Sequence, residues 1–330
     1  MIDLRIFQNF LRVISLGSVS RAAEQVGLTQ SALSQQIAAL ESEFNTVLLH
    51  RTSKGVRPTE AGLIVAGRLQ VIVKQFDTAR EEVNFKHELP TGVVSVGLPS
   101  SVAEILSVPL VEECRARYQG IHLRIGASPN RSLAEELLAS RLDFAVMFEA
   151  SPHKELKHFH VGAESFYMVC AASSNNAKKH EAALEDLAES NLILPCRPHF
   201  IRSTLEQRCA ARNIKIKFAA EVDSLSNIVD LVASGQYESI LPWSALARHV
   251  NQGVAVAVPF DPGISRTVNI SALSEVPLSG AAALVLRLMV EVVQRLVTGQ
   301  RWKGLRLVRD LNVDSVCDQF SSARFSLIRP

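Results

Sequence analysis

The sequence has few cysteines, and none of them stands in a metal-binding pair. Its five cysteines form an odd set without a CxxC motif, which argues against both a zinc site and a disulfide framework. His158 and His160 lie near Glu155, but no further ligands follow at helical or hairpin spacing. We therefore predict no metal site and no cofactor. We interpret the cysteines as reduced structural thiols; a redox pair of Cys196 and Cys209 is the alternative. The five are Cys114, Cys170, Cys196, Cys209 and Cys317.

The chain also lacks a long uninterrupted apolar run. Its most apolar stretch, residues 276–297, contains Arg287 and Glu291, and the centre of a bilayer disfavours both charges. Residues 1–20 are interrupted by arginine and amide side chains, so they lack the apolar block of a signal peptide. We expect a cytoplasmic protein that does not enter a membrane.

Neither sign of charge dominates, and the common catalytic motifs are missing. The formal net charge is +2, so charge alone does not indicate a nucleic-acid partner. The sequence has no GxSxG, P-loop or HExxH motif, which are local signals of nucleophilic, phosphoryl-transfer and zinc-protease chemistry. We therefore predict that the protein is not an enzyme.

The N-terminal part of the chain contains three short helical patterns. Residues 4–16 place apolar side chains at helical spacing, and Gly17 supplies a helix stop. Ser18 or Ser20 can cap a second helix, and Thr29 can cap a third. Two short helices joined by a tight turn, after a leading helix, are typical of a helix-turn-helix.

The third of these helices has one apolar side and one side of small polar and amide groups. Leu33, Ile37 and Leu40 fall within about 60° of each other on a helical wheel, whereas Ser31 and Gln35 point the opposite way. Such groups suit a major-groove reader, because Gln pairs bidentately with adenine and Ser with several base edges. We predict that this face meets DNA; a merely solvated polar face is the alternative.

A hairpin pattern and a long helix follow. Residues 53–55 suit the tip of a hairpin, which we interpret as a wing. Thr59 can cap the next helix, and no proline appears again until Pro90. Apolar side chains in this helix recur at alternating steps of four and three, a heptad seam about 30 Å long. Because a seam on an isolated helix needs a partner, we expect a homodimer; packing on the chain's own domain is the alternative. The predicted seam consists of Val65, Leu69, Ile72, Phe76, Ala79 and Val83.

Beyond residues 89–92 the pattern changes to alternating strands and helices. Strand patterns at 93–98, 121–125 and 142–148 enclose helical patterns at 100–118 and 130–141, the rhythm of a βαβαβ unit with a parallel sheet. We expect a second set with strands at 165–172, 191–195, 215–222 and 238–242, helices at 201–213, 226–233 and 244–250, and a return to the first set through 266–273 and 281–297.

The motif-bearing stretches resemble one known family. The run SRAAEQVGLTQSALSQQIAALE, followed by LLHRTSKGVRPTEAG, is similar to the DNA-binding signature of the LysR-type transcriptional regulators. The likeness continues, more diffusely, through GVVSVGLPSSVAEILSVPLV, SRLDFAVMF, NLILPCRPH and VDSLSNIVDLVASG, and the nitrogen-assimilation-control branch is the nearest. It covers about residues 3–303.

The resemblance implies a fold with three parts. An all-α winged helix-turn-helix and a long linker helix would precede an α/β effector domain of two lobes that resembles periplasmic binding proteins. The boundaries that we expect are 1–58 for the DNA-binding domain, 59–89 for the linker and dimerisation helix, and 90–330 for the effector-binding domain, with lobe I at about 92–161 and 266–303, lobe II at about 162–265 and a tail at 304–330.

The resemblance also implies residues that contact double-stranded DNA. Base contacts would come from the third helix, and phosphate contacts from helix N-termini and the wing. Residues 1–62 contain six Arg or Lys and five Asp or Glu, so a single DNA-binding domain should bind DNA weakly. Joining two such domains in a dimer makes the second DNA contact intramolecular. The predicted DNA-binding residues are Ser20, Arg21, Thr29, Gln30, Ser31, Ser34, Gln35, Arg51, Lys54 and Arg57.

A small effector, expected to be anionic, would bind between the two lobes. Ligands of open α/β sheets lie outside the carboxyl ends of the strands, and serines at helix N-termini favour an anion there. The predicted effector-binding residues are Ser100, Ser101, Ser128, Phe148, Phe200 and Ser224.

The chain is thus predicted to regulate promoters as a homodimer or homotetramer, with RNA polymerase as a further partner. Effector binding would shift the population of lobe geometries. Two alternatives stay open. One is a regulator without ligand control, in which side chains fill the space between the lobes; the other is a cytoplasmic α/β solute-binding protein or enzyme with an incidental helical N-terminus.

Overall fold

The chain begins with a domain of short helices and one hairpin. The structure is a computed structural model that describes residues 3–52, 55–84, 90–261, 263–309 and 311–320. This first domain, called the head below, comprises α1 (Leu4–Leu16), α2 (Val19–Gln25), α3 (Gln30–Glu43), β1 (Leu49–Thr52) and β2 (Gly55–Pro58). Side-chain oxygens of Ser18 and Thr29 accept backbone N–H groups at the starts of α2 and α3. Ser18, rather than Ser20, is therefore the cap of the second helix.

The hairpin β1–β2 is tied to the rest of the head by its backbone. The two strands pair antiparallel from Leu49 opposite Pro58 to Thr52 opposite Gly55. The N–H of Val56 donates to the carbonyl of Gly17 at 2.9 Å. Gly55 has a φ of +123°, and a Cβ at this position would lie 2.2 Å from the same carbonyl oxygen, so only glycine fits this approach.

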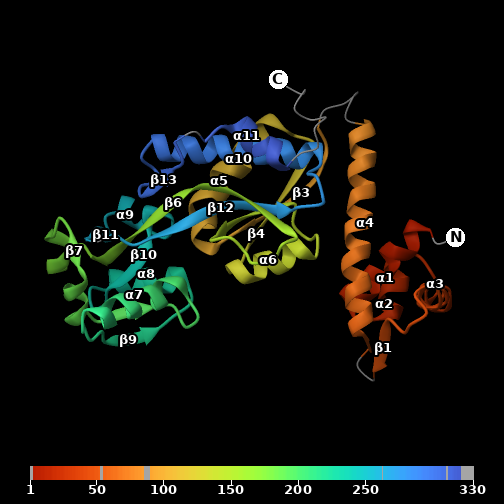
Figure 1. Cartoon of the computed structure of the whole chain (residues 1–330), viewed down its shortest axis with the longest axis horizontal. Helices are drawn as coiled ribbons and strands as arrows, with labels where there is room; N and C mark the ends of the chain where they lie inside the picture. Colours follow the sequence, from red (N-terminus) through yellow and green to blue (C-terminus); the bar gives the residue numbers. More distant parts are fainter. Residues whose placement is uncertain (1–2, 53–54, 85–89, 262, 310, 321–330) are drawn as a thin grey trace.

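A single long helix, α4 (Glu60–Asn84), connects the head to the rest of the chain. Thr59 caps it, because its Oγ1 accepts the N–H of Gly62 at 2.9 Å. Figure 1 shows α4 standing between the head and the α/β domain. The first part of the helix belongs to the head: Val65 and Leu69 are buried in one core with Phe10, Leu33 and other apolar side chains of α1 to α3.

The α/β domain contains the predicted succession of strands and helices. Its first elements are β3 (Gly92–Leu98), α5 (Ser100–Arg117), β4 (Ile121–Ala127), α6 (Asn130–Leu138), β5 (Phe144–Phe148) and β6 (Leu156–Ala171). These are followed by η1 (Asn175–Lys178), β7 (Ala182–Ala183), η2 (Leu184–Ala188), β8 (Leu192–Leu194), α7 (Phe200–Ala211), β9 (Phe218–Glu221), α8 (Leu225–Ala233), β10 (Ser239–Pro242) and α9 (Trp243–Asn251). The last are β11 (Ala255–Asp261), β12 (Ser265–Leu273), α10 (Gly280–Thr298), β13 (Leu305–Leu307) and α11 (Val313–Phe320).

The long strand β6 joins two lobes. Its first half pairs with β12 and β13, beside the parallel strands β3, β4 and β5 of lobe I. Its second half pairs with β10 and β11 in lobe II, where β8 and β9 form a separate parallel pair. Helices α5 and α10 cover one face of the lobe I sheet and α6 covers the other (Figure 1). The two-lobed α/β fold expected from the sequence is therefore present.

Several elements were not predicted. β6 begins at Leu156, well before the strand expected at residues 165–172, and β11 was missed altogether. The described part of the expected tail, 304–330, forms β13 and α11, and Val316 and Phe320 are buried against lobe I. His158 and His160 lie on β6, where their Nδ1 atoms are 2.7 Å from Ser271 Oγ and 3.3 Å from Asn269 Oδ1. None of the described helices is both long and apolar enough to cross a membrane.

Candidate functional site

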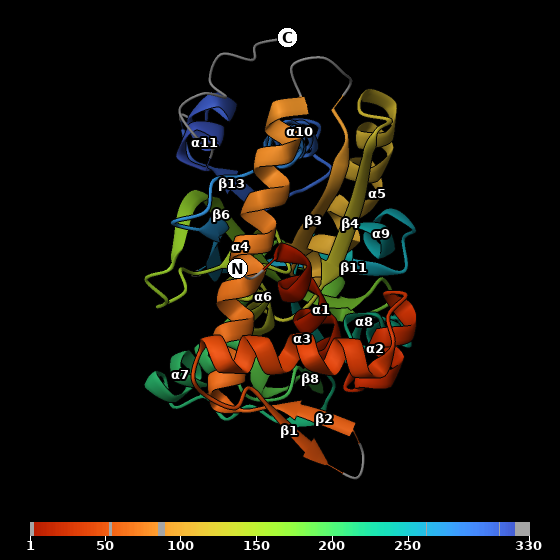
Figure 2. The same ribbon diagram turned by 90° about the vertical axis from the view of Figure 1, so that its right-hand side faces the viewer.

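The polar face of α3 is free for a partner. Gln30, Ser31 and Gln35 are exposed and Ser34 is half-buried, whereas Leu33, Ile37 and Leu40 on the opposite side are buried in the head. Figure 2 shows α3 lying across the lower end of α4, with the hairpin β1–β2 beside it. The helix and the hairpin thus lie at one end of the molecule.

Some of the predicted DNA-binding residues hold each other in place. Ser20 Oγ donates to Gln30 Oε1 at 3.0 Å, and Thr29 Oγ1 lies 3.0 Å from Ser31 Oγ. The Arg21 Nη2 donates to the carbonyl of Leu16 at 2.7 Å, so this arginine also caps the end of α1. These contacts orient the start of α3 before any partner is present.

The hairpin contributes exposed cations. Arg51 on β1 and Arg57 on β2 are both exposed, and neither makes an ion pair with any residue that the structure describes. Lys54 lies outside the described residues. These two guanidinium groups are therefore open to solvent, on the hairpin that lies beside α3.

The predicted dimerisation seam on α4 is divided into two parts. Val65 and Leu69 are 9% and 2% exposed and belong to the core of the head. Ile72 and Phe76 are 46% and 54% exposed, and Ala79 is exposed as well; Val83 lies in α4, but its side chain is outside the described ones. Among the predicted seam residues, exposure therefore starts at Ile72, and Val65 and Leu69 are corrected to residues of the head interior.

One ion pair fastens α4 to lobe I. Lys74 Nζ lies 3.0 Å from Asp143 Oδ1 and donates to the carbonyl of Leu142 at 2.9 Å. The other oxygen of Asp143 accepts the N–H of Ser95 at 2.7 Å. Because Asp143 is itself bonded to the backbone of β3, this contact connects the linker helix to the lobe I sheet.

Three of the predicted effector-binding serines lie at the surface between strands and helices. Ser100 is exposed at the start of α5, where the preceding Pro99 provides no side-chain cap. The N–H of Ser128 donates to the carbonyl of Leu98 at 3.1 Å. Ser224 caps α8 through its Oγ, which accepts the N–H of Asn227 at 3.4 Å. Ser224 thus has a structural role that does not depend on a ligand.

Of the other three predicted effector residues, Ser101 and Phe148 contact a buried arginine, Arg266, and Phe200 lies one side chain further away. The Arg266 guanidinium lies 3.3 Å from the ring centroid of Phe148, and its Nη2 donates to Ser101 Oγ at 2.8 Å. The ring centroid of Phe166 lies 5.0 Å from the guanidinium carbon and 5.9 Å from the ring centroid of Phe200. The sequence therefore predicted side chains that do come together, but Arg266 occupies the space beside Phe148.

Arg266 and its partner Glu164 were missed by the sequence analysis. Arg266 Nη2 and Nε donate to Glu164 Oε2 at 2.7 and 3.1 Å, across the paired strands β12 and β6. Burial lowers the pKa of Arg266, and the adjacent carboxylate opposes that effect; arginine nevertheless keeps its proton in proteins. The available signal was weak: Glu164 is the one carboxylate in the sequence of β6, LKHFHVGAESFYMVCA, and Arg266 is the one cation in the sequence of β12, SRTVNISAL.

His199, just before α7, lies near the positive charge of Arg266. Burial is the largest cause that lowers its pKa, and the positive charge of Arg266 lowers it further, whereas Asp223 raises it. Its Nδ1 is buried and has no hydrogen-bond partner among the described residues. We therefore assign the neutral form of His199 to the folded protein at neutral pH.

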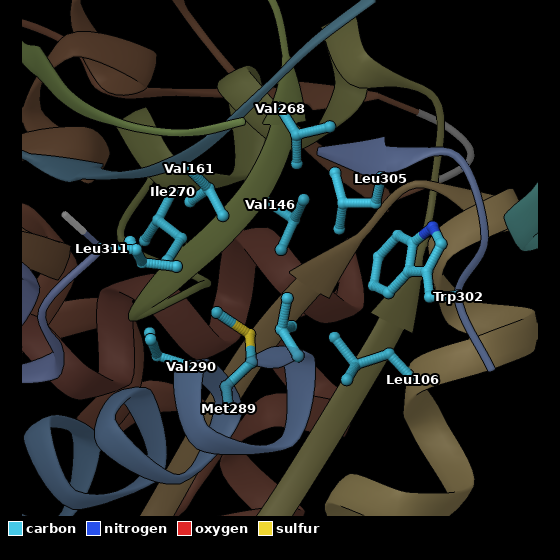
Figure 3. Close-up of a pocket in the computed structure, with 11 residues that line it drawn as sticks. Leu106, Val146, Val161, Val268, Ile270, Met289, Val290, Trp302, Leu305 and Leu311 are labelled. Carbon is cyan, nitrogen blue, oxygen red and sulfur yellow. The ribbon is translucent and has the colours of Figure 1, made fainter. Parts of the chain in front are cut away.

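A hollow inside lobe I lies next to the ion pair of Arg266 and Glu164. Its lining comes from α5, the sheet, α10 and the following segment (Figure 3), and consists of Leu106, Val146, Val161, Val268, Ile270, Met289, Val290, Val293, Trp302, Leu305 and Leu311. Trp302 Nε1 donates to Glu164 Oε1 at 2.9 Å. Because the lining is otherwise apolar, the hollow does not suit an anion.

Among the described residues, no group of three or more His, Cys, Asp or Glu side chains could hold a metal ion. All five cysteines are free thiols. Burial raises the pKa of Cys170 and of Cys317 to about 11 in each case, so these two thiols are protonated and unreactive at neutral pH.

Two family models match the chain, one after the other. Residues 4–63 match the bacterial regulatory helix-turn-helix protein, lysR family, and residues 87–294 match the LysR substrate binding domain. The chain is 31% identical over 297 residues to the nitrogen assimilation regulatory protein nac of Klebsiella aerogenes. The aligned part covers 89% of this chain and 96% of that protein.

Solved structures agree on the fold over almost the whole chain. Full-length OxyR from Pseudomonas aeruginosa covers 94% of this chain and 99% of its own, with a TM-score of 0.74 and 22% identity. Full-length CbnR complexed with its target DNA covers 89% of this chain and 99% of its own, with a TM-score of 0.61 and 18% identity. At these identities the likeness concerns the arrangement of the head, the linker helix and the two lobes.

Proposed function

The chain belongs to the LysR family of transcriptional regulators, and from this premise we propose a mode of DNA recognition and a mode of control. The chain is a DNA-binding regulator with an effector-binding domain. In our proposal α3 enters the major groove, Gln30, Ser31, Ser34 and Gln35 contact base edges, and Arg51, Lys54 and Arg57 contact phosphates. Ser20, Arg21 and Thr29 hold the start of α3 against the backbone of the DNA.

The observation that carries this proposal is the exposed amide and hydroxyl face of α3 beside the unpaired arginines of the hairpin. Amide groups specify a sequence but bind weakly, and the cations attract any duplex. The test is a footprint of the purified full-length protein on genomic DNA, repeated for a Gln35→Ala variant. Loss of preference at one operator position supports the proposal, and an unchanged footprint contradicts it.

The active form in this proposal is a homodimer, or a tetramer of two such dimers. Ile72, Phe76 and Ala79 on α4 would pack against the same residues of a second copy, with Val83 extending the contact. Joining two heads compensates for the weak charge of each one and spaces the half-sites by one or more turns of DNA. The protein would act in the cytoplasm, contact RNA polymerase at the promoter and catalyse no reaction.

Control would come from a small anionic effector bound where the lobes meet. Ser100 at the open start of α5, together with Ser128, Phe200 and Ser224, would contact it, and a change in lobe geometry would alter the angle between the two heads. Thermal shift of the full-length protein against small carboxylates, with Ser100→Ala as the comparison, tests this role. A carboxylate that stabilises both proteins equally would remove Ser100 from the site.

One observation favours a second candidate, a regulator that needs no effector. Ser101 and Phe148 are already engaged by Arg266, whose charge is neutralised by Glu164 within the same chain. A regulator of this kind would bind its operators equally well with and without the metabolites that are tested.

A further inference from the structure

Glu164 is held like a bound ligand rather than like an ordinary strand residue. It is 0% exposed, and each of its carboxylate oxygens accepts hydrogen bonds from parts of the chain that are distant in sequence. Oε2 accepts from Arg266 on β12, at 2.7 and 3.1 Å. Oε1 accepts from Trp302 Nε1 at 2.9 Å and from the N–H of Ser244, in the first turn of α9, at 3.3 Å. The carboxylate therefore joins β6, β12, α9 and the segment after α10.

The donors around that carboxylate resemble those of an anion-binding site. A guanidinium, an indole N–H and a backbone N–H at the start of a helix are three kinds of group that bind a carboxylate in water-excluded sites. The side-chain oxygen of Ser244 is buried, and it has no hydrogen-bond partner among the described residues. Ser244, whose backbone N–H already binds Glu164, thus also carries a hydroxyl that no described residue uses.

The cation of this site also contacts two of the residues predicted for the effector. Arg266 contacts Ser101 and Phe148, and Phe166 connects it to Phe200. Its side chain keeps 6% of its surface exposed, whereas the side chain of Glu164 keeps none. A small anion could therefore reach Arg266 if Glu164 were shortened.

We propose that Arg266, Trp302 and the start of α9 form a binding site for a small carboxylate, and that Glu164 occupies it as a built-in ligand. Glu164 thereby links β6, β12, α9 and the segment after α10 without any small molecule. An anionic effector has to compete with this internal carboxylate for Arg266. The regulatory meaning of the site rests on the proposed effector role, but the site itself does not.

The physical basis is the cost of an unpaired buried charge. Removing one member of a buried ion pair destabilises a protein strongly, because the remaining charge stays desolvated and uncompensated. Replacing both members by apolar groups of similar volume often leaves the stability of the protein unchanged. A free carboxylate that enters the vacated space should therefore restore stability, whereas chloride, which cannot accept in the same two-oxygen geometry, should not.

The test is thermal melting of full-length Glu164→Ala in sodium formate, compared with sodium chloride at equal ionic strength. The variant should melt below the wild-type protein in chloride. Formate at ten times its dissociation constant should raise the melting temperature of the variant by about 3 °C, while the wild-type protein responds equally to both salts. Equal melting temperatures of Glu164→Ala in formate and chloride would overturn the proposal.

Glu238→Ala is the matched control. Glu238 is also a buried carboxylate, but its partners are the neutral side chains of Ser174, Asn176 and Ser190. Its loss leaves no buried cation, so formate should not stabilise this variant more than chloride does. A formate effect of the same size in Glu238→Ala would show that formate acts on any cavity, which contradicts a site at Arg266.

A double variant keeps the test decisive if Glu164→Ala does not fold. Glu164→Ala with Arg266→Met removes both charges, and it should fold with a melting temperature above that of the single variant and without any response to formate. A double variant as unstable as the single one would mean that the unpaired charge is not the cause, and this too would overturn the proposal. The measurement contains no DNA, so failure of the proposed operator recognition cannot produce either result.

Discussion

Replacing Ile72 and Phe76 by serine should dissociate the proposed dimer. The two side chains are 46% and 54% exposed, so about half of each is available for burial by a second copy. Full burial of such a side chain stabilises by about 1.5–3 kcal/mol, and half of it by about 1 kcal/mol. A symmetric dimer contains four of these side chains, which together contribute about 4 kcal/mol. The dimer dissociation constant should therefore rise by about a factor of 10³.

Sedimentation equilibrium of the full-length double variant measures this change directly, and a mobility-shift assay measures its effect on operator binding. Val93→Ser, which removes a similarly exposed valine from β3, is the control and should leave the dimer intact. Leu69→Asp is not suitable, because Leu69 is buried in the head and its replacement should unfold that domain. A double variant that sediments like the wild-type protein would refute the role of α4 in association.

Three further results are expected. Gln35→Ala should reduce base preference at one operator position by about 1–3 kcal/mol without changing stability. Gln36→Ala, which removes the acceptor of the Asn9 amide, should change stability and spare base preference. The reverse pattern would exchange the roles of the two residues. Lys74→Ala should release α4 from lobe I and increase the radius of gyration in small-angle scattering, while Lys74→Arg should not; equal radii would count against this contact. Because the pKa of His199 is lowered in the folded protein, the unfolded chain takes up a proton first as the pH falls below about 6.5, at about 1.4 kcal/mol per pKa unit of the shift. The wild-type protein should then lose more stability than His199→Gln between pH 7.5 and 5.5, and denaturant melts with equal losses would argue against it.

Much of the head was predictable because its signals are local. The side chains of Ser18 and Thr29 cap helices whose first residues follow them directly, and the apolar periodicity of α3 identified its buried side as Leu33, Ile37 and Leu40. The alternation of strand and helix patterns from residue 92 onward predicted the parallel part of lobe I for the same reason. A strand without a clear alternation of its own, such as β11, was missed, since its pairing with β6 and β7 makes it a strand.

The site between the lobes was only partly predictable. Helix starts and strand ends indicated Ser101 and Phe148, and the structure brings both to Arg266. The partner of Arg266 lies 102 residues away in sequence, and nothing local to either residue links the two. Likewise, a heptad pattern identifies an apolar face but not its partner.

The sequence alone determined the order of the parts, the Thr29 cap and the polar face of α3, because each depends on neighbours within a few residues. Tertiary structure decided the division of the α4 seam between the core of the head and the exposed surface, and it decided that Glu164 neutralises Arg266. Both outcomes depend on burial, and the burial of a side chain is set by segments that are distant along the chain.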